Sequence, residues 1–138
     1  MGRTATERVA LMSIHPVYAE AIFQGTKTVE FRKRRLADDI KTVVVYATAP
    51  VSRVLGTFDI GEIVEDSPEA IWSRYGDHGV IGQTAFFDYY EGKEVAVAIV
   101  VEEATSFEKP LALSDVEPNS IAPQSFAYLQ RDQLLVGA

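Results

Sequence analysis

GTKTVEFRKRR, residues 25–35, is the most informative stretch of this sequence, because it places a charged strand directly after a short helix. Successive side chains of a strand point to opposite faces, so Glu30 and Arg32 are expected on one face and Phe31 in the core. Lys27 opens the strand and can lean toward the same face as Glu30. The stretch predicts one carboxylate gathered with two cations. A solvated strand face with ordinary ion pairs is the alternative interpretation.

Short strands and helices are predicted on both sides of this stretch. Apolar and β-branched runs indicate strands over residues 9–14, 27–33, 41–48, 54–64, 95–101 and 107–113. Proline, serine and glycine signals indicate helices over residues 17–24, 68–75 and 83–91. The pattern favours an α+β fold, a small, mixed, mostly antiparallel β-barrel with about three flanking helices. The pattern argues against a dinucleotide-binding fold, since no glycine-rich turn joins a strand to a helix and the strands do not alternate regularly with helices.

The bulk composition indicates a single domain. The chain has 138 residues, of which we expect residues 1–8 to form a disordered lead-in and residues 9–138 one folded domain. With no cysteine it forms no disulfide, and its two widely spaced histidines give no metal spacing, so neither a metal nor a cofactor is expected. Neither a membrane span nor a secretory signal is apparent, which favours a cytoplasmic location.

Charge is distributed unevenly along the chain. The formal net charge is −7. Residues 1–53 carry nine Lys/Arg against five acids, a net of +4, and the remainder carries four against fifteen, a net of −11. This polarity suits a local contact with a phosphate or a short strand, and it argues against the wrapping of a long duplex. The sequence does not indicate an oligomeric state.

Several motifs together resemble a known family. They are SIHP (13–16), G-x-K-x-x-E-x-R (25–32), the strand 43–47 followed by Pro50, and G-x-F-x-I-G (56–61). In this combination they resemble an ASCH domain, a member of the PUA-like superfamily. Three later motifs resemble a bacterial and archaeal branch described as predicted regulators: SPExxW (67–72), YxGK (90–93) and PQSFxY (123–128). The resemblance covers roughly residues 9–130, and the G-x-K-x-x-E-x-R element is its most specific part.

The resemblance implies a PUA-like barrel with a cleft that binds RNA or a nucleotide. Some family members are enzymes: one group removes the acetyl group of N4-acetylcytidine, and others are described as ribonucleases. The amidohydrolase pattern places a lysine three residues before a threonine. Lys27 matches that lysine, but Glu30 stands in the position of the threonine, so the presumed nucleophile is missing. The same deacetylation by the same mechanism is therefore not expected.

The candidate site combines three kinds of side chain. Cations supply charge for phosphate, Glu30 supplies an acceptor for an exocyclic amine, and an aromatic ring supplies a face for an unstacked base. The predicted nucleotide- or RNA-binding residues are Lys27, Glu30, Arg32, Arg34, Gln124, Ser125, Phe126 and Tyr128. The expected partner is single-stranded RNA or a nucleotide, with a flipped-out or free base, modified or not, in a cleft beside the barrel.

A hydrolase acting on RNA or on an N-acylated nucleoside is the alternative. It would use Lys27 and Glu30 as catalytic residues, with Glu30 activating a water and a neighbouring cation stabilising the developing negative charge. Neighbouring cations hold Glu30 ionised, however, and so make it a weaker proton acceptor. The residues therefore favour binding over catalysis and leave the question of an enzyme open.

Overall fold

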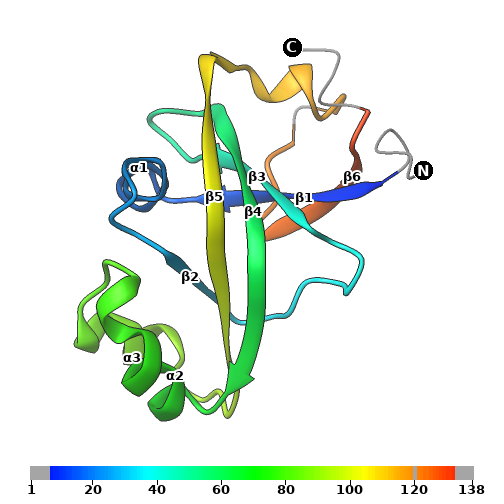
Figure 1. Ribbon diagram of the computed structural model, residues 1–138. Coiled ribbons are helices and arrows are strands. Elements are labelled where there is room, and N and C mark those ends of the chain that lie inside the picture. Colours follow the sequence, from blue (N-terminus) through cyan, green and yellow to red (C-terminus); the bar gives the residue numbers. More distant parts are fainter. Residues whose placement is uncertain (1–6, 120, 133–138) are drawn as a thin grey trace.

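The computed structural model describes residues 7–119 and 121–132 as one strongly curved sheet with helices at one end and at one side of it (Figure 1). Its strands are β1 (Arg8–Ile14), β2 (Val29–Arg32), β3 (Thr42–Ala47), β4 (Arg53–Asp66), β5 (Ala96–Leu111) and β6 (Phe126–Gln130). Its helices are α1 (Pro16–Gln24), α2 (Pro68–Tyr75) and α3 (Gln83–Tyr89), with short 3₁₀ turns at Gly76–His78 and Leu113–Asp115. The expected α+β class is confirmed.

The sheet has the strand order β2-β5-β4-β3-β1-β6. Its pairings are antiparallel except for the parallel pair of β1 and β3. The barrel that the sequence suggested does not close among the described residues, because β2 and β6 remain the two edges of the sheet. The mostly antiparallel character of the prediction is confirmed.

Helix α1 begins and ends where the sequence indicates. The His15 side chain accepts a hydrogen bond from the backbone N–H of Val17, and Pro16 occupies the first helical position, where its missing N–H costs nothing. Gly25 ends the helix in the left-handed conformation, with φ of 85°. The helix thereby delivers the chain directly into β2.

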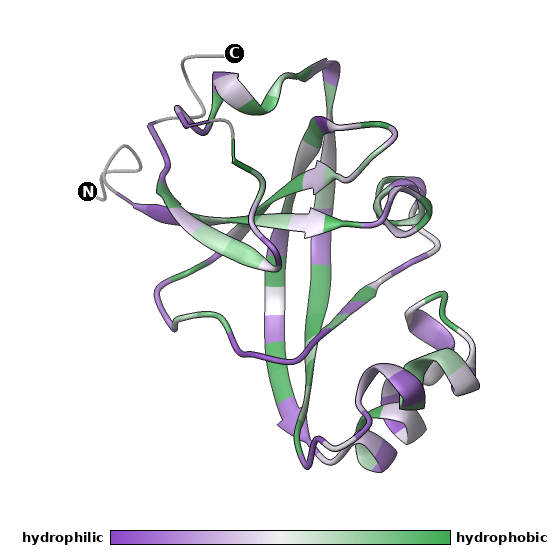
Figure 2. Ribbon diagram, turned by 180° about the vertical axis from the view of Figure 1, so that it is seen from behind, coloured by the Kyte–Doolittle hydropathy of each residue, from purple (hydrophilic) through white to green (hydrophobic). Residues whose placement is uncertain are grey.

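Strands β4 and β5 form a long hairpin whose ends are joined by α2 and α3. Figure 2 shows alternating hydrophobic and hydrophilic bands along β4, which match its alternation of buried and exposed residues in the first half. The register of the hairpin shifts just before Gly56 and on passing Gly61, as expected for glycines at bulges. The inserted helices form a second core around the fully buried Phe86.

The structure corrects two predictions at the C-terminal end. The runs over residues 95–101 and 107–113 are not separate strands, because β5 continues through Pro110 to Leu111. Proline is tolerated there because β2 pairs with β5 only from Val97 to Val100, so the rest of β5 has one free edge. The sixth strand is instead β6, which pairs with β1. Residues 1–6 of the expected lead-in lie outside the described residues.

In the part of the chain that the structure describes, no helix is long and apolar enough to cross a bilayer.

Substitution of Gly56 tests the close approach of the two hairpin strands. A Cβ at Gly56 would clash with the carbonyl oxygen of Thr105, whereas a Cβ at Gly61 would meet nothing nearer than 3.5 Å. We expect Gly56→Ala to lower the free energy of unfolding by about 1–3 kcal/mol, since the paired backbones must separate. Gly61→Ala is the matched control and should cost less than about 1 kcal/mol. Urea unfolding measures both, and equal costs would contradict the assigned bulge at Gly56.

Candidate functional site

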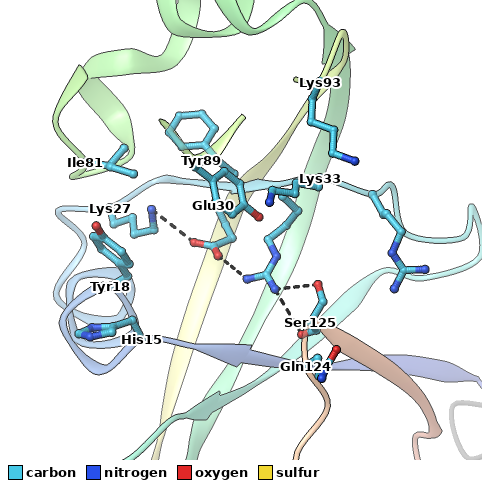
Figure 3. Close-up of a pocket in the computed structure, with 13 residues that line it drawn as sticks. His15, Tyr18, Lys27, Glu30, Lys33, Ile81, Tyr89, Lys93, Gln124 and Ser125 are labelled. Carbon is cyan, nitrogen blue, oxygen red and sulfur yellow. Dashed lines mark hydrogen bonds and ion pairs between the residues drawn. The ribbon is translucent and has the colours of Figure 1, made fainter. Parts of the chain in front are cut away.

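A cavity of about 550 Å³ opens between α1, β2, the α2–α3 insertion and the segment that precedes β6. Figure 3 shows His15, Tyr18 and Ile81 on one side of it, Lys33 and Lys93 on the other, and Gln124 and Ser125 below. The lining residues are His15, Tyr18, Lys27, Glu30, Phe31, Arg32, Lys33, Arg34, Ile81, Tyr89, Lys93, Gln124 and Ser125. Its size suits a small ligand such as a nucleotide.

Three buried charged side chains form the floor of the pocket. Lys27, Glu30 and Arg32 expose 3%, 5% and 8% of their surface. The Lys27 ammonium lies 3.3 Å from one Glu30 oxygen, and the Arg32 guanidinium lies 2.9 Å from the other. Strand alternation places Glu30 and Arg32 on one face, as the sequence predicts. Burial of all three rules out the solvated strand face.

Backbone carbonyls and a serine complete the shell of this triad. The Lys27 Nζ donates to the carbonyl oxygen of Gly79 at 2.5 Å. Arg32 donates through Nη1 to the carbonyl oxygen of Ser13 at 3.4 Å, and through Nη2 to Ser125, at 2.8 Å to Oγ and 3.3 Å to the carbonyl oxygen. Arg32 on edge strand β2 therefore reaches the segment leading into the opposite edge strand, β6.

Burial shifts the pKa of two pocket side chains, Lys27 on the floor and Tyr89 on one wall. Desolvation lowers the pKa of Lys27, although the adjacent Glu30 carboxylate opposes this effect. While Lys27 is protonated, the two cations and the one carboxylate of the triad leave it with a single net positive charge. Burial also raises the pKa of Tyr89 above its ordinary value, so this pocket tyrosine stays in its neutral phenol form further into alkaline pH.

The rim carries three cations that are free of ion pairs. Lys33, Arg34 and Lys93 line the pocket and are exposed. None of them forms a salt bridge with a carboxylate of the described residues, whereas Arg8, Lys27, Arg32 and Arg35 all do. Lys33 Nζ lies 4.6 Å from the centre of the Tyr89 ring. Unpaired cations at a pocket mouth are suited to bind a phosphate.

Most of the predicted site residues meet in this pocket. Those that line it are Lys27, Glu30, Arg32, Arg34, Gln124 and Ser125. Phe126 and Tyr128 lie beyond it on β6: Phe126 is half-buried beneath Arg34, and the Tyr128 hydroxyl accepts a hydrogen bond from the N–H of Ala37. The two aromatic residues therefore do not line the pocket itself.

The sequence interpretation missed several lining residues. They are His15, Tyr18, Ile81, Tyr89 and Lys93. His15 caps α1, and it also lines the pocket. Tyr18 lies in the first turn of α1, three residues after the cap His15, and is half-buried. Tyr89 resembled the core aromatics of its own helix, so nothing local distinguished it.

The pocket does not contain an obvious metal site. Among residues 7–119 and 121–132, no group of three or more histidine or acidic side chains is arranged to hold a metal ion. The chemistry that the lining residues offer is hydrogen bonding to a polar edge, aromatic contact and charge stabilisation.

The chain is similar to known proteins over most of its length. The ASCH domain family model matches residues 12–111. An ASCH domain-containing ribonuclease from Zymomonas mobilis is 33% identical over 128 residues, which cover 90% of this chain and 86% of the relative. The large ribosomal subunit protein uL22 of Ureaplasma parvum is 31% identical over 126 residues, but these cover only 40% of that protein. The crystal structure of ASCH from Zymomonas mobilis superimposes with a TM-score of 0.85 at 32% identity, covering 93% of this chain and 92% of that one.

Removal of the Glu30 carboxylate tests the energetic role of the triad. Glu30→Ala leaves two buried cations facing each other without a counter-charge, so we expect the free energy of unfolding to fall by about 3–5 kcal/mol. Glu65→Ala is the matched control, because Glu65 is exposed and pairs with Arg35 at 3.5 Å. It should cost less than about 1 kcal/mol. Chemical unfolding of both variants gives the comparison, and equal losses would mean that the triad is not a structural unit.

Proposed function

The chain belongs to the ASCH domain family, and on that premise we propose that it binds single-stranded RNA by taking one base into the pocket above Lys27, Glu30 and Arg32. The observation that carries the proposal is a buried carboxylate held between two cations at the floor of a nucleotide-sized cavity. A carboxylate has about four acceptor positions, and the two cations use two of them. The others suit the exocyclic amine of a base.

Neighbouring side chains support the same assignment. Gln124 and Ser125 line one side of the pocket and offer a carboxamide and a hydroxyl to the edge of a base. Tyr18 and Tyr89 offer aromatic surface on the other walls. The lining thus combines polar groups for one planar ligand edge with apolar surface for its faces.

The charge distribution favours a short single strand over a duplex. The unpaired rim cations Lys33, Arg34 and Lys93 supply local positive charge. The C-terminal part of the chain, from residue 54 onward, carries fifteen acids against four Lys/Arg. An extended duplex would meet this acidic surface, whereas one or two nucleotides at the pocket would not.

RNA cleavage is a second candidate function, favoured by the relative that is named a ribonuclease. A cleaving enzyme must stabilise the negative charge that develops on the phosphoryl oxygens, and Lys27 or Arg32 could do this from the floor of the pocket. If Arg32 takes this role, Lys27 can instead accept a proton, because desolvation lowers the pKa of its amine. An N-acylated nucleoside as substrate has no comparable support.

Binding of short RNA tests the first candidate. Isothermal titration with single-stranded RNA should show binding that Gln124→Ala weakens about tenfold, through loss of hydrogen bonds to the base edge. Glu30→Gln, which keeps the shape of the side chain, should weaken it at least as much. Gln24→Ala is the control, since Gln24 is exposed at the end of α1 outside the pocket. Unchanged affinity in both pocket variants would reject this pocket as the binding site.

Cleavage of end-labelled RNA tests the second candidate. If the chain is a ribonuclease, Lys27→Gln should reduce the rate by about a hundredfold or more, because the buried cation that faces the reacting group is lost. Lys109→Gln is the matched control, since Lys109 lies on the far part of β5 and does not line the pocket. A rate that survives Lys27→Gln would place the activity elsewhere or in a contaminant.

A further inference from the structure

Two consecutive cations beyond β2 cover two different aromatic rings. Lys33 Nζ lies 4.6 Å from the centre of the Tyr89 ring on α3, and the Arg34 guanidinium carbon lies 4.8 Å from the centre of the Phe126 ring on β6. We propose that Tyr89 and Phe126 are stacking platforms for two separate bases of one RNA strand, and that Lys33 and Arg34 uncover them by moving to its phosphates. This inference rests on the proposed RNA-binding function.

Both cations are able to move. Lys33 and Arg34 are exposed, and neither forms a salt bridge with a carboxylate of the described residues. A contact between an exposed cation and an aromatic ring is weaker than the stacking of a base on the same ring. An RNA strand that brings both a base and a phosphate therefore replaces the weak cation–ring contact with stronger base–ring stacking. Its phosphate gives the displaced cation a new partner.

The two platforms differ in their relation to the pocket. Tyr89 lines it and is 36% exposed, so the base that stacks there is the one whose edge faces the triad. Phe126 lies outside the pocket and is half-buried. Arg34, which lines the pocket, covers the Phe126 ring. A lone nucleotide in the pocket reaches the first platform, and only a longer strand reaches the second.

The second aromatic ring of β6, that of Tyr128, is closed to a base. Tyr128 lies next to Phe126, with ring centres 5.6 Å apart, and is covered by Arg8 at 4.4 Å. Unlike Lys33 and Arg34, Arg8 is held by two hydrogen bonds to Asp39, of 2.9 and 2.6 Å. The Tyr128 hydroxyl is itself engaged by the N–H of Ala37. The stacking surface consequently ends at Phe126.

Leucine substitutions test the two platforms, because leucine retains apolar bulk while removing the aromatic face. Two probes are used. The first is whichever of the four homotetranucleotide RNAs binds most tightly to the unmodified protein, and the second is the 5′-mononucleotide of the same base. Phe126→Leu should weaken tetranucleotide binding about tenfold and leave mononucleotide binding within about twofold. Tyr89→Leu should weaken binding of both probes about tenfold. Tyr128→Leu is the matched control and should leave both within about twofold.

Thermal unfolding of each variant shows that it is folded before binding is measured. If Phe126→Leu leaves tetranucleotide binding unchanged, or if Tyr128→Leu weakens it tenfold, the two-platform inference is wrong while the pocket assignment stands. If the tetranucleotide binds no more tightly than the mononucleotide, the second platform does not exist. If neither probe binds to the unmodified protein, the proposed function and this inference fail together.

Discussion

Burial of three charges at one place is the constraint on which this structure depends. A cation or carboxylate withdrawn from water needs compensating charge and hydrogen bonds, or the fold loses several kcal/mol. Glu30 supplies the charge for both Lys27 and Arg32, and further donors of these two cations bind carbonyl and hydroxyl oxygens from distant parts of the chain, although the buried Nε of Arg32 has no partner among the described residues. Gly79 belongs to the α2–α3 insertion, and Ser125 to the segment before β6. The groups that hold the insertion and the last strand in place are thus the groups that form the pocket floor.

The pocket therefore combines a rigid floor with an adaptable rim. The floor is pre-organised, because each of its charges is fixed by a partner before any ligand arrives, and pre-organisation reduces the entropy lost on binding. The rim cations have long side chains, and two of them, Lys33 and Arg34, rest on aromatic rings, so they can adjust to a phosphate in more than one position. Such a division suits a ligand with one planar, polar part and one flexible, charged part.

The sequence predicted those features that depend on neighbouring residues. Pro16 and Gly25 marked the two ends of α1, and strand alternation placed Glu30 beside Arg32. The features it missed depend on pairing between distant segments. Strand β6 has few β-branched residues, and its partner β1 lies more than a hundred residues earlier. Tyr89 enters the pocket because of the way the helical insertion packs against β2, which no local pattern reveals.

The pairing of β1 with β6 has a consequence for how the chain acquires its structure. Val9 pairs with Leu129, so β1 meets one of its two partners only after all of β2 to β5 has been synthesised. Until then β1 has the parallel strand β3 on one side and an open edge on the other. Open strand edges promote association between chains. The nascent chain is accordingly exposed to misassembly at this edge until β6 has been synthesised and has paired with β1.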